Sequence, residues 1–191
     1  MSKKTVVISL FGGPGSGKST SAAYIFSLFK NKGYVAELVQ EYVKTWAWEG
    51  RKIDTYDQIL FAGKQVKAES RLFGVVDLIV TDSPVWLSAF YAHRHCPPVL
   101  YQGVEALVRS FYSQSEIDGH THIPVFMNRS KPYVPKGRYE TEEQAVEIDG
   151  EMRKFLTDRG IKYLEVNSNF PNLEILCEYL IKEEKIQQND C

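Results

Sequence analysis

Short runs of apolar, mostly β-branched residues alternate along this sequence with longer stretches in which apolar residues recur every three or four positions. The short runs predict strands at residues 6–10, 75–80, 121–127 and 161–166, and alternation predicts another strand at residues 34–39. The longer stretches predict helices at residues 19–30, 55–73, 85–94, 99–116, 141–158 and 171–185. Strands that alternate with helices in this way predict an α/β fold with a parallel sheet and right-handed crossovers.

Two of the predicted helices begin with a capping signal. Thr55 and Thr141 are each followed, three residues later, by a glutamine, Gln58 and Gln144. In a capping box the threonine hydroxyl accepts the backbone N–H of the third residue, whose side chain accepts the threonine N–H in return. We therefore expect a helix to start at each threonine. Pro124 counts against a fully paired fourth strand, because proline cannot donate to a ladder.

The first strand run leads into a glycine-rich segment that matches the phosphate-loop pattern G-x-x-x-x-G-K-[ST]. Glycines permit positive φ and close backbone approach, so successive N–H groups can point at phosphate oxygens. The lysine of this pattern reaches the β- and γ-phosphates, and the serine binds Mg²⁺. The alternative is a glycine-rich turn that binds nothing. We expect Mg²⁺ and ATP, held by Gly12, Gly13, Pro14, Gly15, Ser16, Gly17, Lys18, Ser19 and Thr20.

Acidic residues follow the second and third strand runs, at the edge of the sheet where ligands of parallel α/β proteins bind. Glu41 is a candidate base for an acceptor hydroxyl or a holder of metal-bound water, and the alternative is an ordinary exposed glutamate. Asp82 stands where a Walker-B acid would hold Mg²⁺ together with Ser19. The alternative for Asp82 is a turn residue in Asp-Ser-Pro.

Three further residues are candidates for the substrate. Tyr42 and Trp46 follow Glu41 closely, and their rings suit stacking on a base, although packing of an amphipathic helix explains them equally well. Arg94 ends the helical stretch after Asp82 and is a candidate ligand of a substrate phosphate, with a solvated helix end as the alternative.

A polar, basic and proline-bearing segment at residues 128–140 follows the fourth strand run and predicts a short lid. Cations that close over a γ-phosphoryl group stabilise its transfer, and closure excludes water. Arg129 and Arg138 are the preferred candidates because guanidinium binds phosphate bidentately, and a solvated basic loop is the alternative. Asn167, after the fifth strand run, is a candidate contact for the nucleotide base or part of a plain helix cap.

Composition narrows the class of protein. The 191 residues fit one α/β domain, and 23 basic against 24 acidic residues give a net charge of -1, which disfavours a nucleic-acid binder without forbidding a local basic cleft. No apolar run approaches the roughly 18 residues of a membrane span. The three cysteines form no C-x-x-C pair, as is typical of reduced thiols in a cytosolic protein. We expect a single cytoplasmic domain, residues 1–191, with no membrane partner.

Taken with these motifs, the sequence resembles the P-loop kinases of nucleosides and nucleotides, and most of all the small AAA-type ATPase/kinase group that contains the nicotinamide riboside kinase domain. The resemblance rests on residues 12–19, on Glu41-Tyr42, on Thr81-Asp82-Ser83, and on residues 136–138 with the helix that follows. It implies a three-layer α/β/α core with the sheet order 2-3-1-4-5.

The resemblance also implies residue roles. Lys18 and Ser19 carry phosphate and Mg²⁺, Glu41 lies beside the acceptor hydroxyl, Asp82 beside the metal, and Arg138 in the lid. One departure concerns the substrate, because the lid of the nicotinamide riboside kinase domain reads Asp-Gly-x-Arg and this chain has Lys136 in the acidic place.

The expected function is therefore transfer of the γ-phosphoryl group of Mg-ATP to a nucleoside, a nucleotide or a related small metabolite. One alternative is a kinase of a hydroxyl on modified DNA, as in phage metabolism. Another is an ATP-binding regulator with weak turnover. A switch GTPase is disfavoured, because the segment from Asn128 does not match the guanine-reading N-K-x-D.

Overall fold

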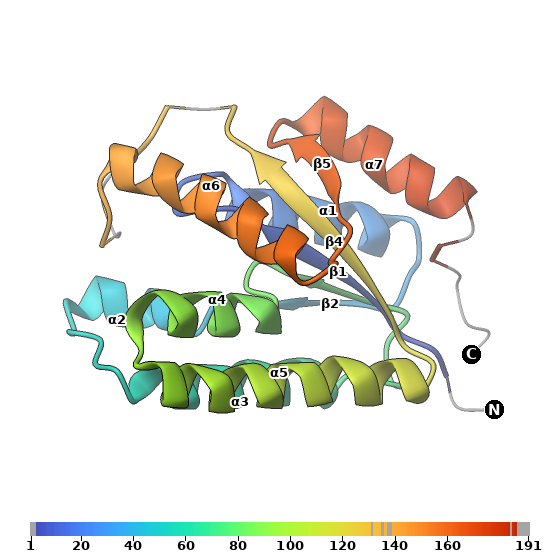
Figure 1. Cartoon of the computed structure of the whole chain (residues 1–191). Coiled ribbons are helices and arrows are strands. Elements are labelled where there is room, and N and C mark those ends of the chain that lie inside the picture. Colours follow the sequence, from blue (N-terminus) through green and yellow to red (C-terminus); the bar gives the residue numbers. More distant parts are fainter. Residues whose placement is uncertain (1–2, 131, 135, 137–138, 184, 187–191) are drawn as a thin grey trace.

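The computed structural model describes residues 3–130, 132–134, 136, 139–183 and 185–186, and it has one sheet covered by helices on both faces (Figure 1). The strands are β1 (Val6–Phe11), β2 (Ala36–Val39), β3 (Leu78–Thr81), β4 (Thr121–Asn128) and β5 (Leu164–Asn167). The helices are α1 (Lys18–Asn31), α2 (Val43–Glu49), α3 (Asp57–Ser70), α4 (Val85–His95), α5 (Pro98–Ile117), α6 (Glu142–Asp158) and α7 (Phe170–Lys182).

The strand order is β2-β3-β1-β4-β5, and every neighbouring pair is parallel. This confirms the predicted α/β class and the sheet order 2-3-1-4-5. Since the strands run parallel, their carboxyl ends meet at one edge of the sheet. The register places Val39 of β2 beside Thr81 of β3, so the residues that follow these two strands begin side by side.

Alternate residues of the sheet face two separate helical layers. Ile8 and Leu10 of β1 pack with α1 and α7, whereas Phe11 packs with α3, α4, α5 and α6. The same alternation places Met127 of β4 in the first cluster and Phe126 in the second. Both faces of the central strands are therefore buried, which explains why their sequence runs are continuously apolar.

The two capping signals have different outcomes. Thr141 forms the expected box with Gln144 at the start of α6. The prediction for Thr55 is wrong, because the bonds expected between Thr55 and Gln58 do not form and the carboxylate of Asp54 binds two earlier backbone N–H groups instead. Asp54 accepts from the backbone N–H groups of Tyr56 at 2.7 Å and Asp57 at 3.1 Å, and α3 starts at Asp57.

Two other details of the sequence acquire a place in the fold. Pro124 lies in β4 opposite Ser9, but β5 pairs with β4 only from Val125 onward, so the proline lies beyond the stretch with neighbours on both sides. Helix α2 was not among the predicted helices, and it occupies part of the aromatic segment after Glu41. Among the described residues, the helices lack the combination of length and apolar character that crossing a bilayer demands.

Candidate functional site

The phosphate-loop sequence joins β1 to α1 at the carboxyl edge of the sheet. Gly17 precedes α1 with φ +92°, and Gly15 has φ +81° with a ring carbon of Tyr133 2.6 Å from where a Cβ would stand. Glycine is therefore required at both positions. The Oγ of Ser16 is buried and finds no hydrogen-bond partner among the residues that the structure describes. A buried hydroxyl left in this way is compatible with a loop that is completed by a ligand.

The side chain of Lys18 folds back over the loop. Its Nζ donates to the carbonyl oxygens of Gly12 at 2.5 Å and Gly13 at 3.1 Å. The ammonium group is therefore held at the mouth of the loop by groups that phosphate oxygens can replace. Of the predicted nucleotide-binding residues, the ones that line the large cavity at this edge are Pro14, Gly15, Gly17, Lys18, Ser19 and Thr20.

An ion pair between the residue after β4 and helix α6 holds the phosphate loop in place, and we call it the brace. Arg129 pairs with Asp149 of α6 at 2.6 Å, and its guanidinium also donates to the carbonyls of Pro14 and Ala145, both at 2.7 Å. Asp149 accepts the backbone N–H of Gly13 at 2.5 Å with its other oxygen. The guanidinium of Arg129 is thus engaged by the protein and does not line the cavity, where a lid cation was expected.

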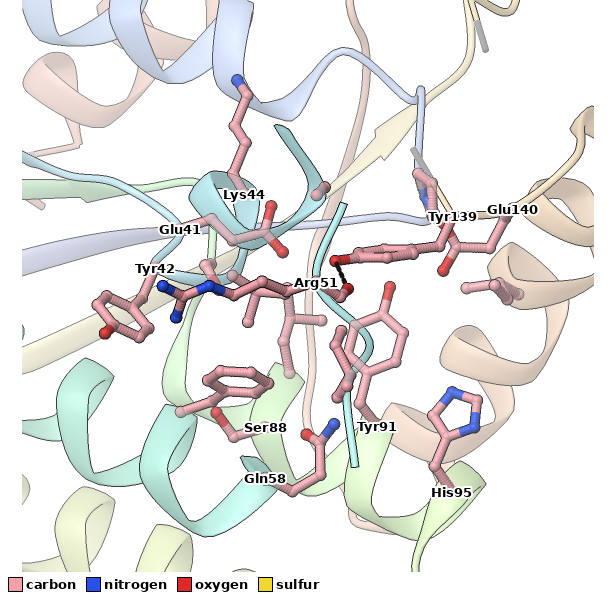
Figure 2. A pocket seen from close by; sticks show the side chains of 18 of the residues that line it. Glu41, Tyr42, Lys44, Arg51, Gln58, Ser88, Tyr91, His95, Tyr139 and Glu140 are labelled. Atoms are coloured by element: carbon pink, nitrogen blue, oxygen red, sulfur yellow. Dashed lines mark hydrogen bonds between the residues drawn. The ribbon is translucent and has the colours of Figure 1, made fainter. Parts of the chain in front are cut away.

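The second predicted lid cation, Arg138, lies outside the described residues, so the structure gives it no place. Lys136 and Tyr139, its described neighbours in the segment, both line the cavity. The hydroxyl of Tyr139 donates to the carbonyl oxygen of Arg51 at 2.9 Å. Figure 2 shows this bond between the lid segment and the segment that follows α2.

The two predicted acids meet at the ends of β2 and β3. The Oδ1 of Asp82 accepts the backbone N–H of Glu41 at 2.9 Å, and Asp82 is only 2% exposed. Burial raises the pKa of the Glu41 carboxyl, and the charge of Lys18 opposes this. Asp82 and Glu140 raise the pKa of Glu41 further. Glu41 therefore lies within electrostatic reach of the phosphate loop and holds a proton more tightly than an ordinary glutamate.

The oxygens near the phosphate loop fit the preferences of Mg²⁺. Ser19 stands in the first turn of α1 and lines the cavity, and Asp82 presents a buried carboxylate at the end of β3. Hydroxyl and carboxylate oxygens are hard donors, and magnesium bound to a nucleotide takes few protein ligands. The residues present therefore suit a metal that is shared with phosphate oxygens.

The cavity extends from the phosphate loop to a wall built by α2, α3 and α4, and its volume is about 970 Å³. Tyr42 and Phe61 line it, and Trp46 packs edge-on against Phe61 with ring centroids 5.1 Å apart. Of the two predicted aromatic contacts, Tyr42 lines the cavity, whereas Trp46 does not line it and packs against Phe61. This wall offers flat apolar surface for a ring.

Polar side chains complete that end of the cavity. In Figure 2 the carboxylate of Glu41, the carboxamide of Gln58 and the hydroxyl of Tyr91 point into the same space. Burial raises the pKa of the Tyr91 hydroxyl, and the charge of Glu41 raises it further. The hydroxyl therefore stays protonated and can donate a hydrogen bond.

Two predicted ligands have other partners. Arg94 lines the cavity but pairs with Glu151 and, at 3.9 Å, with Glu147, so it ties α4 to α6. Asn167 is exposed at the end of β5 and does not line the cavity. Its neighbour Ser168 is the residue that meets the phosphate loop, since its Cβ lies 2.8 Å from where a Cβ of Gly17 would stand.

Sequence reasoning missed several residues of the site. Gln58, Phe61 and Gln65 line the cavity from one helical face, with spacings of three and four residues. The glutamines are 6% and 3% exposed, which is unusual for this residue type. A helical-face analysis could have found the three together, but the supposed capping role of Gln58 concealed it. No sequence signal marked the contact between Tyr139 and Arg51.

Comparisons with known proteins agree with this architecture. The family model described as AAA domain matches residues 7–172. A comparison with curated protein sequences finds no match.

Among solved structures, the NadR protein in complex with NR aligns with a TM-score of 0.70 and 15% identity, over 97% of this chain and 53% of NadR. The NadR complex with NAD and AMP-PNP aligns with a TM-score of 0.66 and 16% identity, over 98% of this chain and 51% of NadR. Deoxyadenosine kinase from M. mycoides, with dCMP and dCDP bound, gives 0.55 and 15%, over 94% of this chain and 98% of the kinase. This chain spans about half the length of NadR. At these identities the likeness shows a shared fold.

Proposed function

Because this chain belongs to the AAA domain family and has the fold of P-loop nucleoside kinases, we propose that it is an ATP-dependent phosphotransferase. It moves the γ-phosphoryl group of Mg-ATP to a hydroxyl of a nucleoside, a nucleotide or a related small metabolite. The observation that carries this proposal is that one cavity joins the phosphate loop to a wall lined by aromatic and amide side chains. Glu41 lines the same cavity, and its carboxyl interacts electrostatically with Lys18 at one end and with Tyr91 at the other.

The phosphate end supplies charge and position. The loop N–H groups and the ammonium group of Lys18 bind the β- and γ-phosphate oxygens. Ser19 and Asp82 would hold Mg²⁺, which when bound neutralises charge on those oxygens. The brace formed by Arg129 and Asp149 fixes the loop, so binding does not have to order it.

The acceptor end supplies the nucleophile. Tyr42 and Phe61 hold a ring against the wall of the cavity, which directs a hydroxyl of the acceptor toward Glu41. The carboxylate of Glu41 accepts the hydroxyl proton as the oxygen attacks the γ-phosphorus, and the bond from the γ-phosphorus to the β,γ-bridging oxygen breaks, so that ADP leaves. A pKa raised by burial brings the base closer to neutral pH, where general-base catalysis is most efficient.

The lid segment completes the site. Lys136 and Tyr139 line the cavity beside the phosphate loop, and Tyr139 holds the segment to the carbonyl of Arg51. We infer that Arg138, which the sequence places between them, is the cation that closes over the γ-phosphoryl group. Closure excludes water, which favours transfer to an acceptor over hydrolysis of ATP.

The proposal is tested by measuring ADP release from Mg-ATP by the purified chain. The panel contains nucleosides, nucleotides and hydroxymethylated DNA, and it includes nicotinamide riboside because NR is bound in the NadR structure. We expect ADP release that depends on one of the small acceptors. Release stimulated only by DNA, with a steep salt dependence, would favour the DNA kinase, and release independent of every acceptor would refute a kinase function.

A further inference from the structure

Three side chains of α3 form one face toward the acceptor end of the cavity. Gln58, Phe61 and Gln65 are three and four residues apart, so they share one side of the helix. Phe61 lies between the two carboxamides along that side. A ring stacked near Phe61 would therefore meet an amide on either side of it.

The amide nitrogen of Gln65 is fully committed to the protein. Its Nε2 donates to Oε1 of Glu69 and to Oγ1 of Thr81, both at 3.2 Å. A primary amide has two N–H groups, so both are used. The Oε1 of Gln65 accepts no hydrogen bond from the described part of the chain, and it is the group left for a ligand in the cavity.

The two anchors of Gln65 are themselves held in place. Glu69 stands one helical turn further along α3 and is fully buried. Burial raises its pKa to about 8, and the hydrogen bond from Gln65 opposes this effect. Thr81 is fully buried at the end of β3 and also accepts the backbone N–H of Ser83 at 3.2 Å. The amide nitrogen of Gln65 therefore lies between two anchors that are both fully buried.

Gln58 provides the contrast within the same face. Its carboxamide is buried to 6% exposure, and no hydrogen bond to it is found within the described ranges. It can turn either its oxygen or its nitrogen toward a ligand. The orientation of Gln65 is therefore the feature of this wall that distinguishes one ligand edge from another.

We propose that Gln65 is a fixed hydrogen-bond acceptor that selects an acceptor substrate whose ring carries an exocyclic amino or carboxamide N–H group, and that Glu69 and Thr81 are its positioning residues. This inference rests on the proposed function, because it names the substrate class of the same site. An analogue with an oxo or carboxylate oxygen in place of the N–H group would face the Gln65 oxygen with another acceptor. Buried groups left unpaired in this way make such sites discriminate strongly.

The test uses pairs of nucleosides that differ in this group: adenosine and inosine, cytidine and uridine, nicotinamide riboside and nicotinic acid riboside. We measure kcat/KM for both members with wild-type protein and take their ratio. We expect at least one pair to favour the N–H donor by about tenfold or more. The ratio is informative because a general loss of stability lowers both members alike.

Variants separate the selecting residue from its anchors. Gln65→Leu should bring the ratio close to one. Glu69→Leu should do the same through loss of the anchor, whereas Glu69→Gln keeps an uncharged acceptor for the Gln65 amide and should retain the ratio. Gln102→Leu, on the exposed side of α5, is the matched control and should leave the ratio at the wild-type value.

Binding of the same six nucleosides without ATP, measured by calorimetry, distinguishes the two proposals. A donor preference in binding that depends on Gln65, without any phosphorylation, would refute the kinase function and support the inference. Phosphorylation with ratios near one or inverted, or a ratio that survives Gln65→Leu, would overturn the inference and leave the kinase function standing. Absence of both binding and turnover for all six would refute both.

Discussion

The two ends of the cavity are lined by different kinds of group, backbone at one end and side chains at the other. At the phosphate end the contact groups are backbone N–H and carbonyl groups of a glycine-rich loop, with Lys18 folded over them. At the acceptor end they are side chains of α3, of α4 and of the segment at the start of α2, such as Gln65, Tyr91 and Tyr42. A backbone site depends on a few dihedral angles, whereas a side-chain site depends on how several helices pack.

This difference predicts separate consequences for substitution. Changes at the phosphate end should affect every acceptor equally, because under the proposed function that end binds the phosphates of ATP whichever acceptor is used. Changes at the acceptor end should alter the choice among acceptors. Glu41 stands between the two, since its pKa responds to Lys18 and it influences Tyr91 in turn.

The largest effect is expected for Lys18→Ala. Removing the ammonium group from the developing phosphoryl charge should lower acceptor-dependent ADP release by about 10³-fold, and by the same factor for each acceptor. The fold should persist, because the side chain lies among loop carbonyls and not in the core. Lys154→Ala, an exposed position on α6, is the control, with circular dichroism to check folding. Near-normal turnover of Lys18→Ala would show that the phosphate loop is not part of the active site.

Glu41→Gln should have the next largest effect, a fall in turnover of about 10²-fold with unchanged ATP affinity. The base must be ionised, and its raised pKa places the acidic limb of the kcat profile at higher pH than for an ordinary glutamate. Glu37→Gln, four residues earlier and exposed on β2, is the matched control. Unchanged turnover in Glu41→Gln would show that another group takes the proton.

The contrast between backbone and side-chain groups also explains which parts of the molecule could be predicted from the sequence. The strands and most helices follow from local periodicity, and the phosphate loop follows from residue types that a tight turn requires. Even local signals compete, however: before α3 the carboxylate of Asp54 accepts the backbone N–H groups of Tyr56 and Asp57, and the box expected between Thr55 and Gln58 does not form.

Side-chain partnerships across the fold could not be predicted in this way. Arg129 meets Asp149 and the phosphate loop only because β4 and α6 pack beside it. Ser168, and not Asn167, lies against Gly17 because β5 fixes which side of the chain faces the loop. The role of Gln65 depends on Thr81, which is sixteen residues away on a strand.

Glu69 should give the acceptor end a distinctive dependence of stability on pH. Its pKa of about 8 in the folded chain exceeds the ordinary value of 4.5, so the folded state holds the proton more tightly. The stabilisation of the folded state that comes from this tighter proton binding is complete below about pH 4.5. It is lost as the pH rises toward 8, by up to about 1.4 kcal/mol per pH unit.

Urea unfolding at pH 5.5 and 7.5 measures this slope. The free energy of unfolding of wild type should fall between pH 5.5 and pH 7.5, and that of Glu69→Gln should not fall for this reason. The difference between variant and wild type should therefore shift by about 2 kcal/mol in favour of the variant. Glu116→Gln, exposed on α5, should show no such difference. If wild type and Glu69→Gln change in parallel, the carboxyl of Glu69 is not buried in its neutral form.

Asp149→Ala should weaken ATP binding by about tenfold, because it removes both the acceptor for the Gly13 N–H and the partner of Arg129. Asp149→Asn should cost less, since its amide oxygen can still accept the Gly13 N–H. Acceptor ratios should not change in either variant, as expected for a residue of the phosphate end. The control is Asp158→Ala on the same helix, because Asp158 pairs only with the exposed Lys154 among the described residues. Equal ATP affinity in wild type and all three variants would show that the pair of Arg129 and Asp149 does not support ATP binding.

The smallest effects are expected at the helix caps, and they test whether the two ends are supported separately. Thr141→Ala removes the cap of α6, which carries Asp149, and Asp54→Ala removes the carboxylate that starts α3, which carries Gln65. Each should lower the free energy of unfolding by about 1 kcal/mol. Thr141→Ala should raise the Kd for ATP about twofold with little change in acceptor KM, and Asp54→Ala should do the reverse, since a few tenths of a kcal/mol correspond to that factor. If both variants shifted both constants alike, the packing of the helices would couple the two ends of the cavity, and the backbone site would not be independent of the side-chain site.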